Sequence, residues 1–301
     1  MSRSTASAKV DGWLILDKPV GLGSTPAVGK VRRLFGAEKA GHGGTLDPLA
    51  SGVLPIALGE ATKTVPFVME GRKEYRFTLR LGEARSTDDA EGQVTATSDA
   101  RPTDQEIRRV LSRFIGQIEQ TPPAYSALKI AGRRAYDLAR AGEAVELKPR
   151  QVSVERLDFV ARPDLDHADF VVACGKGTYI RSLGRDLARA LGTVGYLAAL
   201  RRTAAGPFRE ERAISLSKLL ALGHIPALLG VLAPVATALD DIPALALTEA
   251  QADRLRQGQP VFLTRDAPPP GALLRAEAGS KLVALVRSDG AAVKPVRVFN
   301  L

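Results

Sequence analysis

The order of apolar and polar positions predicts an irregular alternation of strands and helices. Trp13-Leu14-Ile15-Leu16 is a short apolar run that ends at a lysine and a proline, which is typical of a buried strand running into a turn. Residues 75–81 alternate strictly between apolar and polar, and residues 151–160 and 168–174 are predicted to form two further strands. No strand–helix unit repeats, so the pattern favours the α+β class, with a mixed, mainly antiparallel sheet flanked by helices.

Helices are predicted where apolar residues recur every three or four positions after a capping signal. Ser24-Thr25-Pro26 starts one of them, with the proline at the first helical position. Thr103-Asp104-Gln105-Glu106 is a capping box that precedes an apolar helical face. Residues 178–191 are predicted to form a third helix, with Arg181, Arg185 and Arg189 along one face. Such a row is usually a solvated face, but it also suits a phosphate backbone.

The last sixty residues differ in pattern from the rest of the chain. Asp240-Asp241-Ile242-Pro243 marks a boundary, and Thr248-Glu249-Ala250-Gln251 caps a short helix that ends at Gly258. Short β-like runs then follow at 260–264, 272–276, 282–287 and 295–299, which predict a small β-barrel-like module. We therefore expect a flexible N-terminus over 1–10, a main domain over 11–240 and a C-terminal module over 242–301.

Composition narrows the setting in which the protein works. The chain has 301 residues, 45% of them hydrophobic, and carries a formal charge of +9, which favours a polyanionic partner. On charge alone, a genome-wide bias toward basic residues explains the excess equally well. A single cysteine, Cys174, excludes a disulfide framework and indicates a reducing compartment, so we expect a cytoplasmic protein. The three histidines lack metal-ligand spacing, and no apolar run is long enough to span a membrane.

Residues 41–52, Gly41-His42-Gly43-Gly44-Thr45-Leu46-Asp47-Pro48-Leu49-Ala50-Ser51-Gly52, are the segment that packing explains least. Four glycines and a proline disfavour a regular helix or strand, and the loop holds one imidazole and one carboxylate. Pro48 restricts the backbone of Asp47 to the extended region. A plain Asp-Pro turn and a functional carboxylate both remain open on residue chemistry alone.

The sequence also predicts the surroundings of two other charged features. Asp88-Asp89-Ala90-Glu91-Gly92 lacks the ligand register of a calcium loop, so the sequence predicts an acidic surface turn. Arg181 lies near the start of its helix, where a positive charge opposes the helix dipole. We therefore expect a carboxylate or a phosphate from elsewhere to compensate it.

Six blocks of the sequence together carry a family resemblance, because their order and spacing match as well as their residues. They are similar to the bacterial tRNA pseudouridine-55 synthases, of the B type, over essentially residues 10–220. Residues 242–301 resemble the small PUA-like RNA-binding domain of those enzymes. The blocks are Gly12…Leu16-Asp17-Lys18-Pro19, residues 40–52, Gly59-Glu60-Ala61-Thr62-Lys63, Lys73-Glu74-Tyr75-Arg76, Tyr125-Ser126-Ala127-Leu128-Lys129 and Lys176-Gly177-Thr178-Tyr179-Ile180-Arg181.

The resemblance implies an isomerase that converts uridine 55 in the T loop of tRNA to pseudouridine. The N1–C1′ bond breaks, the base turns, and it is rejoined through C5, with no cofactor and no metal. The target base must leave the folded loop, at a cost of a few kcal/mol of lost stacking. The implied partner is the T stem-loop of tRNA, the implied fold is the pseudouridine synthase sheet, and the protein is expected to be a monomer.

The resemblance also assigns roles to residues. Asp47 becomes the essential carboxylate, Arg181 pairs with it and orients it, and Tyr75 stacks on the target base and assists proton transfer at C5. Whether Asp47 attacks C1′, attacks C6 or takes a proton from the sugar stays open. His42 is expected to fill the space that the extracted base leaves. Tyr179 and Leu200 line the pocket, Lys18 and Pro19 shape its floor, and the basic side chains of Lys129, Arg133, Arg134, Arg185, Arg189, Arg201 and Arg202 track phosphates.

Two readings from other functional classes remain beside this one. A tRNA-folding chaperone, alone or as an additional role, needs RNA binding but not the carboxylate. An aspartate-dependent hydrolase acting on another nucleotide would release free base or phosphate, which the isomerase reaction does not.

Overall fold

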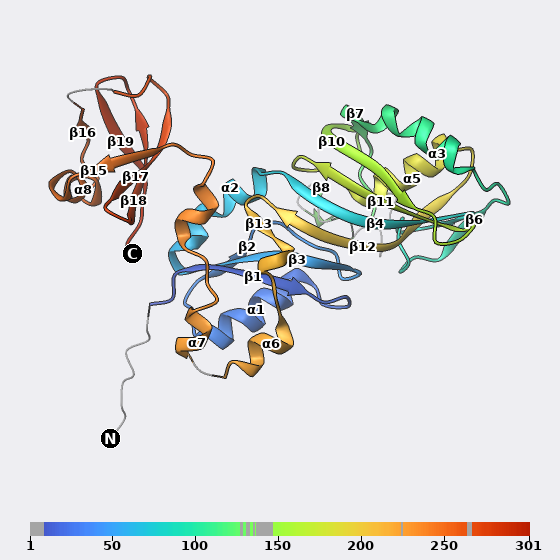
Figure 1. Ribbon diagram of the computed structural model, residues 1–301, viewed down its shortest axis with the longest axis horizontal. Coiled ribbons are helices and arrows are strands. Elements are labelled where there is room, and N and C mark those ends of the chain that lie inside the picture. Colours follow the sequence, from blue (N-terminus) through green and yellow to red (C-terminus); the bar gives the residue numbers. More distant parts are fainter. Residues whose placement is uncertain are drawn as a thin grey trace.

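A mixed β-sheet crosses the body of the molecule and carries the rest of the fold (Figure 1). The computed structural model describes residues 9–126, 129, 130, 133, 134, 136, 147–223, 225–263 and 267–301. Within these residues the sheet has ten strands, in the order β14-β1-β3-β12-β4-β11-β10-β7, with β2 beside β3 and β13 beside β12. Only the β1–β14 and β3–β12 pairs are parallel in it, so the predicted α+β class with a mainly antiparallel sheet is confirmed. Its strands are β1 (Gly12–Lys18), β2 (Ala40–His42), β3 (Ala50–Leu58), β4 (Lys73–Leu81), β7 (Gly116–Gln120), β10 (Arg150–Ala161), β11 (His167–Cys174), β12 (Gly195–Ala205), β13 (Phe208–Arg209) and β14 (Ile214–Ser215).

Both faces of the sheet are buried near β1, because alternate side chains of a strand point to opposite sides. Leu14 and Leu16 belong to one apolar core, to which four helices also contribute side chains: α1 (Ser24–Phe35), α3 (Asp104–Val110), α5 (Ile180–Ala190) and α6 (Leu216–Ala221). Trp13 and Ile15 belong to a second core on the opposite face, where the rings of Trp13 and Phe208 lie 5.1 Å apart. The predicted buried strand is confirmed, and the continuous apolar run at 13–16 reflects its burial on both sides.

The capping signals in the sequence place the helices. Thr103 and Thr248 each accept a hydrogen bond from the backbone three residues on, and Glu106 and Gln251 reach back, so both predicted capping boxes are confirmed. The arginine-bearing helix begins at Ile180, two residues later than predicted. No helix within the described ranges is long and apolar enough to cross a bilayer. The helices are α1 (Ser24–Phe35), α2 (Val65–Glu70), α3 (Asp104–Val110), α5 (Ile180–Ala190), α6 (Leu216–Ala221), α7 (Ile225–Leu229) and α8 (Glu249–Arg256).

The two central strands β3 and β12 were not predicted from the sequence. β3 begins inside the glycine-rich segment, so its irregular part is only residues 43–49. Gly52 has φ +97°, and a Cβ there would lie 2.2 Å from the carbonyl oxygen of Arg202 on β12. A glycine that looks like a strand breaker in the sequence thus allows the two parallel strands to approach.

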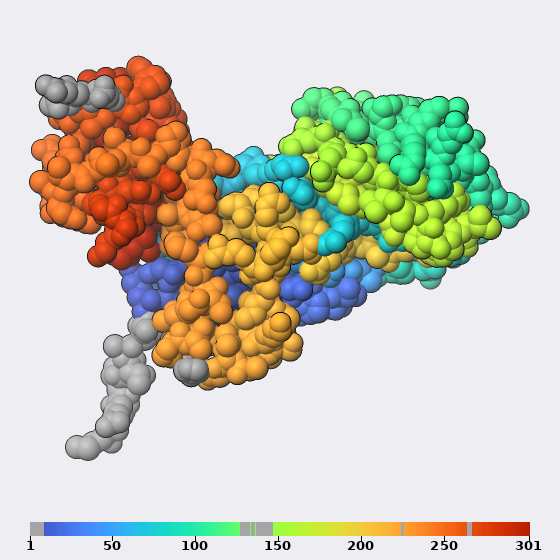
Figure 2. All heavy atoms as spheres, viewed as in Figure 1, coloured from blue at the N-terminus to red at the C-terminus, as the bar shows by residue number. Residues whose placement is uncertain are grey.

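The C-terminal residues form a separate five-stranded sheet in the order β15-β17-β18-β19-β16, which confirms the predicted β module. Figure 2 shows it as a lobe at one end of the body. Lys63 Nζ donates to Val298 O at 2.8 Å, and Asn300 N donates to Glu60 Oε2 at 2.8 Å. Phe299 adds its ring to the core around Trp13, so apolar packing also joins the lobe to the body. The strands are β15 (Ala244–Leu247), β16 (Val261–Phe262), β17 (Leu273–Ala278), β18 (Lys281–Ser288) and β19 (Ala292–Val298).

Candidate active site

Asp47 lies on the loop 43–49, which connects β2 to β3 at the middle of the sheet. Leu46, the residue before it, is buried, and its backbone N–H and C=O both bond to Ser24 Oγ, at 2.8 Å each. After it, Pro48 O accepts from Gly21 N at 2.8 Å, and Ala50 N donates to Asp47 O at 3.1 Å. Because the backbone is held on both sides, the loop presents the carboxylate in one position.

Arg202 fixes the same loop from the neighbouring strand β12. Its side chain is fully buried, and its guanidinium donates to Val53 O at 2.7 Å, Gly44 O at 3.0 Å and Thr45 O at 3.3 Å. A buried cation of this kind is stable only when its donors are satisfied, as they are here by carbonyl groups. In this structure Arg202 therefore braces the loop, and the contact with phosphate that we expected of it stays a prediction.

Lys18 holds the loop from the other side. It is also fully buried, and Nζ donates to Leu22 O at 2.6 Å, Pro19 O at 2.9 Å and Pro48 O at 3.3 Å. Burial lowers the pKa of Lys18 to about 8, while the negative charge of Asp47 opposes that shift. This side chain is buried beneath the loop, and its expected roles in shaping the floor of the site and in contacting RNA stay predictions.

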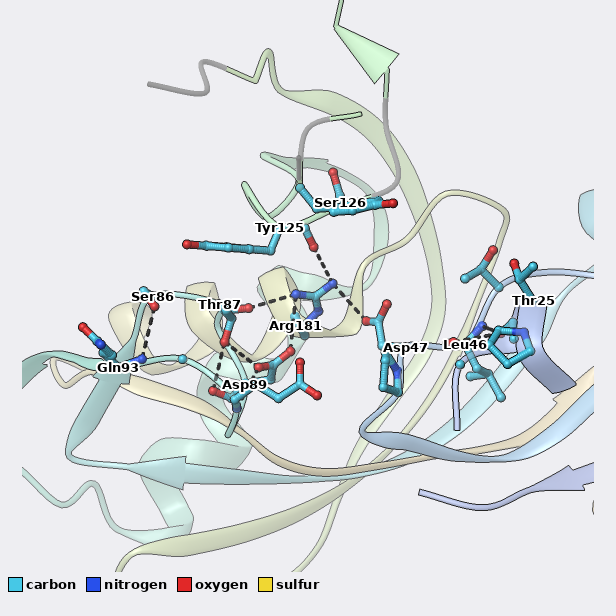
Figure 3. Close-up of a pocket in the computed structure, with 18 residues that line it drawn as sticks. Thr25, Leu46, Asp47, Ser86, Thr87, Asp89, Gln93, Tyr125, Ser126 and Arg181 are labelled. Carbon is cyan, nitrogen blue, oxygen red and sulfur yellow. Dashed lines mark hydrogen bonds and ion pairs between the residues drawn. The ribbon is translucent and has the colours of Figure 1, made fainter. Parts of the chain in front are cut away.

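Arg181 is the nearest cation to Asp47, with 2.9 Å between Arg181 Nη2 and Asp47 Oδ2. The same guanidinium donates to Tyr125 O at 2.8 Å and to Thr87 O at 3.0 Å, and Nη1 lies 3.4 Å from Asp89 Oδ2. Figure 3 shows Arg181 between Asp47 on one side and Asp89 and Thr87 on the other. The expectation that a distant carboxylate compensates Arg181 is confirmed, and two carboxylates share the task.

The turn at 88–92 is not the solvated acidic turn that we predicted. Asp89 is buried against Arg181, and Asp88 Oδ2 lies 2.9 Å from Arg185 Nη1. Burial raises the pKa of Asp88, and Arg185 opposes the shift. Residue types alone do not reveal these pairings, because the arginines of α5 that hold the two acids lie about ninety residues later in the chain.

Two of the larger cavities in the described part of the chain meet at Asp47. The smaller, of about 380 Å³, is lined by Tyr75 on β4, Tyr179 before α5 and Leu200 on β12, together with Asp47 and Arg181. The larger, of about 800 Å³, lies between the start of α1 and the turn at 86–93, and Figure 3 shows its wall. A small planar group can thus enter beside the carboxylate while the chain attached to it occupies the larger space.

The two tyrosines of the smaller cavity keep their protons at neutral pH. Burial raises the pKa of Tyr75, and the nearby charge of Arg202 only partly offsets this. Burial also raises the pKa of the half-buried Tyr179. Their rings are therefore neutral, flat walls, which suit stacking on an aromatic base.

His42 ends β2 and lines neither of the two cavities. It is half-buried, and its Nδ1 accepts a hydrogen bond from Gly44 N at 3.4 Å. Burial, with Arg202 nearby, lowers the pKa of His42, so the imidazole is neutral at pH 7. The structure places it at the start of the Asp47 loop, on the same backbone but outside the cavity walls.

The basic residues expected to track phosphates differ in accessibility. Arg185 and Arg201 are held by carboxylates, Arg201 by Asp17 at 2.9 Å and Glu210 at 2.8 Å. Arg189 is 68% exposed, with Asp186 at 3.8 Å, and Arg133 is exposed. The side chains of Lys129 and Arg134 lie outside the described residues. No group of three or more acidic, histidine or cysteine side chains in the described ranges is arranged to hold a metal ion.

Comparisons with known proteins agree along nearly the whole chain. The TruB family pseudouridylate synthase N-terminal domain matches residues 32–180, and the tRNA pseudouridylate synthase B C-terminal domain matches residues 181–240. The tRNA pseudouridine synthase B of Bradyrhizobium diazoefficiens is 57% identical over 97% of this chain and 86% of its own. That of Gluconacetobacter diazotrophicus is 56% identical over 96% of this chain and 97% of its own.

Solved structures show the same fold. A chain in an H/ACA RNP bound to a substrate RNA containing 2′-deoxyuridine superposes with a TM-score of 0.75 and 26% identity, covering 96% of this chain and 85% of that one. A chain of a Cbf5-Nop10-Gar1 complex gives a TM-score of 0.74 and 28% identity, with the same coverage.

Proposed function

Since the chain belongs to the TruB family of pseudouridylate synthases and is a tRNA-modifying isomerase, we propose that it acts on uridine 55 of the T loop, with Asp47 as the essential carboxylate. The observation that carries this proposal is the setting of Asp47. The carboxylate is 40% exposed at the meeting point of two cavities, and its partner Arg181 is 7% exposed behind it. A fixed, ionisable group that opens onto a base-sized space is what the reaction needs.

The reaction balances without any oxidant or reductant. The N1–C1′ bond breaks, a C5–C1′ bond forms, C5 loses a proton and N1 gains one. The three candidate steps for Asp47, attack at C1′, attack at C6 and removal of a sugar proton, all require the carboxylate beside the target nucleoside. Arg181 orients it for any of them, because its guanidinium is itself fixed by two backbone carbonyls.

The cavity walls suggest how the base is received. Tyr75 stacks on the uracil, and Tyr179 and Leu200 close the other sides of the space. The raised pKa of Tyr75 favours stacking over a role as a phenolate base at C5. His42, at the rim of the loop, would occupy the place of the base in the RNA once it is extracted.

The same proposal covers the roles of the two domains, the oligomeric state, the cellular location and the cofactor requirement. Residues 11–240 form the catalytic domain, and 242–301 act as an RNA-binding module that extends the contact with tRNA. The protein works as a monomer in the cytoplasm, where tRNA is modified, with no cofactor.

The test is to incubate the protein with an unmodified tRNA transcript and to map every new pseudouridine. We expect pseudouridine at position 55 and none in a transcript with cytidine there. Asp47→Asn should abolish turnover and retain tRNA binding, because it removes the charge at nearly constant volume. Asp99→Asn, at an exposed acid, is the matched control. Modification at another uridine would overturn the position, and product formation by Asp47→Asn would overturn the role of the carboxylate.

The same variant separates an additional folding role from catalysis. If the protein also helps tRNA to fold, Asp47→Asn should still accelerate the refolding of a misfolded transcript. Release of free uracil or phosphate by the wild-type protein would instead support the hydrolase reading.

A further inference from the structure

Gln120 lies at the end of the edge strand β7. Its side-chain amide nitrogen and oxygen both form hydrogen bonds with the backbone of Tyr179. Its side chain is 2% exposed. Nε2 donates to Tyr179 O at 3.1 Å, and Oε1 accepts from Tyr179 N at 2.8 Å. A glutamine amide has a donor and an acceptor placed as in a peptide group. It therefore pairs with the backbone of Tyr179 in the way that a residue of a neighbouring strand would.

Tyr179 needs such a partner because it is the residue that precedes the first turn of α5. Its backbone is extended, with φ −97° and ψ 112°, and its own side chain makes no capping hydrogen bond. Its carbonyl already accepts from Leu183 N at 3.0 Å, as the first bond of the helix. Gln120 therefore satisfies the Tyr179 N–H and fills the second acceptor site of the carbonyl.

The residues after Gln120 attach to the same turn. Thr121 O accepts from Ser182 Oγ at 2.8 Å and from Arg185 Nη2 at 2.9 Å. Tyr125 O accepts from Arg181 Nη2 at 2.8 Å. We call residues 120–125 the strap, and the prolines at 122 and 123 within it are buried.

We propose that Gln120 is a positioning residue, which sets the start of α5 and thereby the places of the Tyr179 ring and the Arg181 guanidinium relative to Asp47. The proposal rests on the site assigned above, since it gives Gln120 no contact with the base. Tyr179 and Arg181 are two residues apart on this turn, so a rotation of the Tyr179 peptide moves both. A misplacement of about 1 Å in such a site can cost about 100-fold in rate.

Gln120→Met removes both hydrogen bonds at nearly constant volume. We expect the single-turnover rate to fall about 10- to 100-fold, while the Kd for tRNA changes by less than about threefold. Backbone amide exchange across residues 179–183 should accelerate, because that turn loses its anchor. Gln117→Met, at an exposed position three residues earlier on β7, is the matched control and should leave the rate and the exchange unchanged.

Gln120→Glu separates positioning from general packing. A protonated carboxyl has an O–H donor and a C=O acceptor, so it can replace the two hydrogen bonds that the amide makes. A carboxylate has no donor and would face the Tyr179 carbonyl. Among the described residues, the charged groups near this site include Arg150, opposite Gln120 on β10, and Arg185, which donates to the neighbouring Thr121 O at 2.9 Å. Arg181 and Asp47 also act on Tyr179. The rate of Gln120→Glu divided by that of the wild type should rise toward one as the pH falls from about 8 to about 5.5. Groups that titrate in both proteins affect both rates equally, so their effect cancels in this ratio.

Each result either supports or overturns the positioning role of Gln120. A pH-dependent ratio for Gln120→Glu and a flat one for Gln117→Glu support the proposal, even if Gln120→Met fails to fold. A flat, low ratio for Gln120→Glu indicates packing alone and overturns it, as does an unchanged rate with unchanged amide exchange in Gln120→Met. The rate is scored at whichever uridine the wild type modifies, so failure of the assignment to position 55 leaves this test intact.

Discussion

Arg181 and Asp47 form an ion pair whose two members differ sharply in exposure. The arginine side chain is 7% exposed and the aspartate side chain 40%, with 2.9 Å between Nη2 and Oδ2. The buried partner is fixed by the carbonyls of Thr87 and Tyr125, so the accessible partner is oriented without being covered. This asymmetry leaves one face of the carboxylate open to a substrate.

Asp89 should matter for turnover although it does not pair with Asp47. It shares Arg181 at 3.4 Å, so Asp89→Asn leaves that cation with one charged partner and a less defined position. We expect the single-turnover rate to fall about 10-fold with tRNA affinity retained. Rapid-quench assays and binding titrations check this, with Asp99→Asn as the control. An unchanged rate would show that Tyr125 and Thr87 suffice to position Arg181.

Arg202 should contribute more to stability than any exposed arginine. Arg202→Met leaves three carbonyls of the Asp47 loop and β3 without their donor, so we expect a loss of about 3 kcal/mol in the free energy of unfolding. Arg212→Met, at an exposed site, should change it by less than about 0.5 kcal/mol. Urea titrations compare the two variants. Equal effects would contradict the role of Arg202 as a brace.

Gly52 and Gly116 offer a matched pair, because both have positive φ but different surroundings. A Cβ at Gly52, φ +97°, would lie 2.2 Å from Arg202 O, whereas at Gly116, φ +96°, it would meet nothing within 4 Å. Gly52→Ala should cost about 3–5 kcal/mol, since it forces β3 and β12 apart. Gly116→Ala should cost about 1–2 kcal/mol from backbone strain alone. Thermal unfolding of the two variants measures the difference.

The lowered pKa of Lys18 should make the free energy of unfolding depend on pH. Burial lowers its pKa from 10.5 to about 8, so between these pH values the unfolded chain binds more protons than the folded one. Its contribution to stability is therefore constant below about pH 8 and rises from there to about pH 10.5. Lys18→Met removes this contribution, so the stability of the wild type minus that of the variant should increase from about pH 7 to about pH 10. Lys73, whose pKa is also about 8, is present in both proteins and cancels. A difference that stays flat with pH would contradict the lowered pKa.

Local signals in the sequence were sufficient for the elements that have a clear period or a cap. The strand at Trp13–Leu16, the alternating strand β4 and both capping boxes depend on residues within a few positions of one another. The strands β3 and β12 were missed because glycine, proline and arginine interrupt their apolar residues. These residue types fit a strand only where the neighbouring strands accommodate them. Gly43 shows the same limit, since a Cβ there would lie 2.5 Å from Val68 Cγ1, which belongs to a different element.

For the site, residue types and their spacing were enough to select the candidate groups. Asp47 before Pro48 in a glycine loop, and Arg181 at a helix start in need of a negative partner, were both visible, and the family blocks connected them. Tertiary structure alone decided the settings of the others: Arg202 and Lys18 are buried braces, and Asp89 is a partner of Arg181 instead of a surface acid. The physical reason is that burial and pairing depend on which distant backbone carbonyls and charges come within hydrogen-bond distance. That is a property of the packed sheet, and the residue types do not encode it locally.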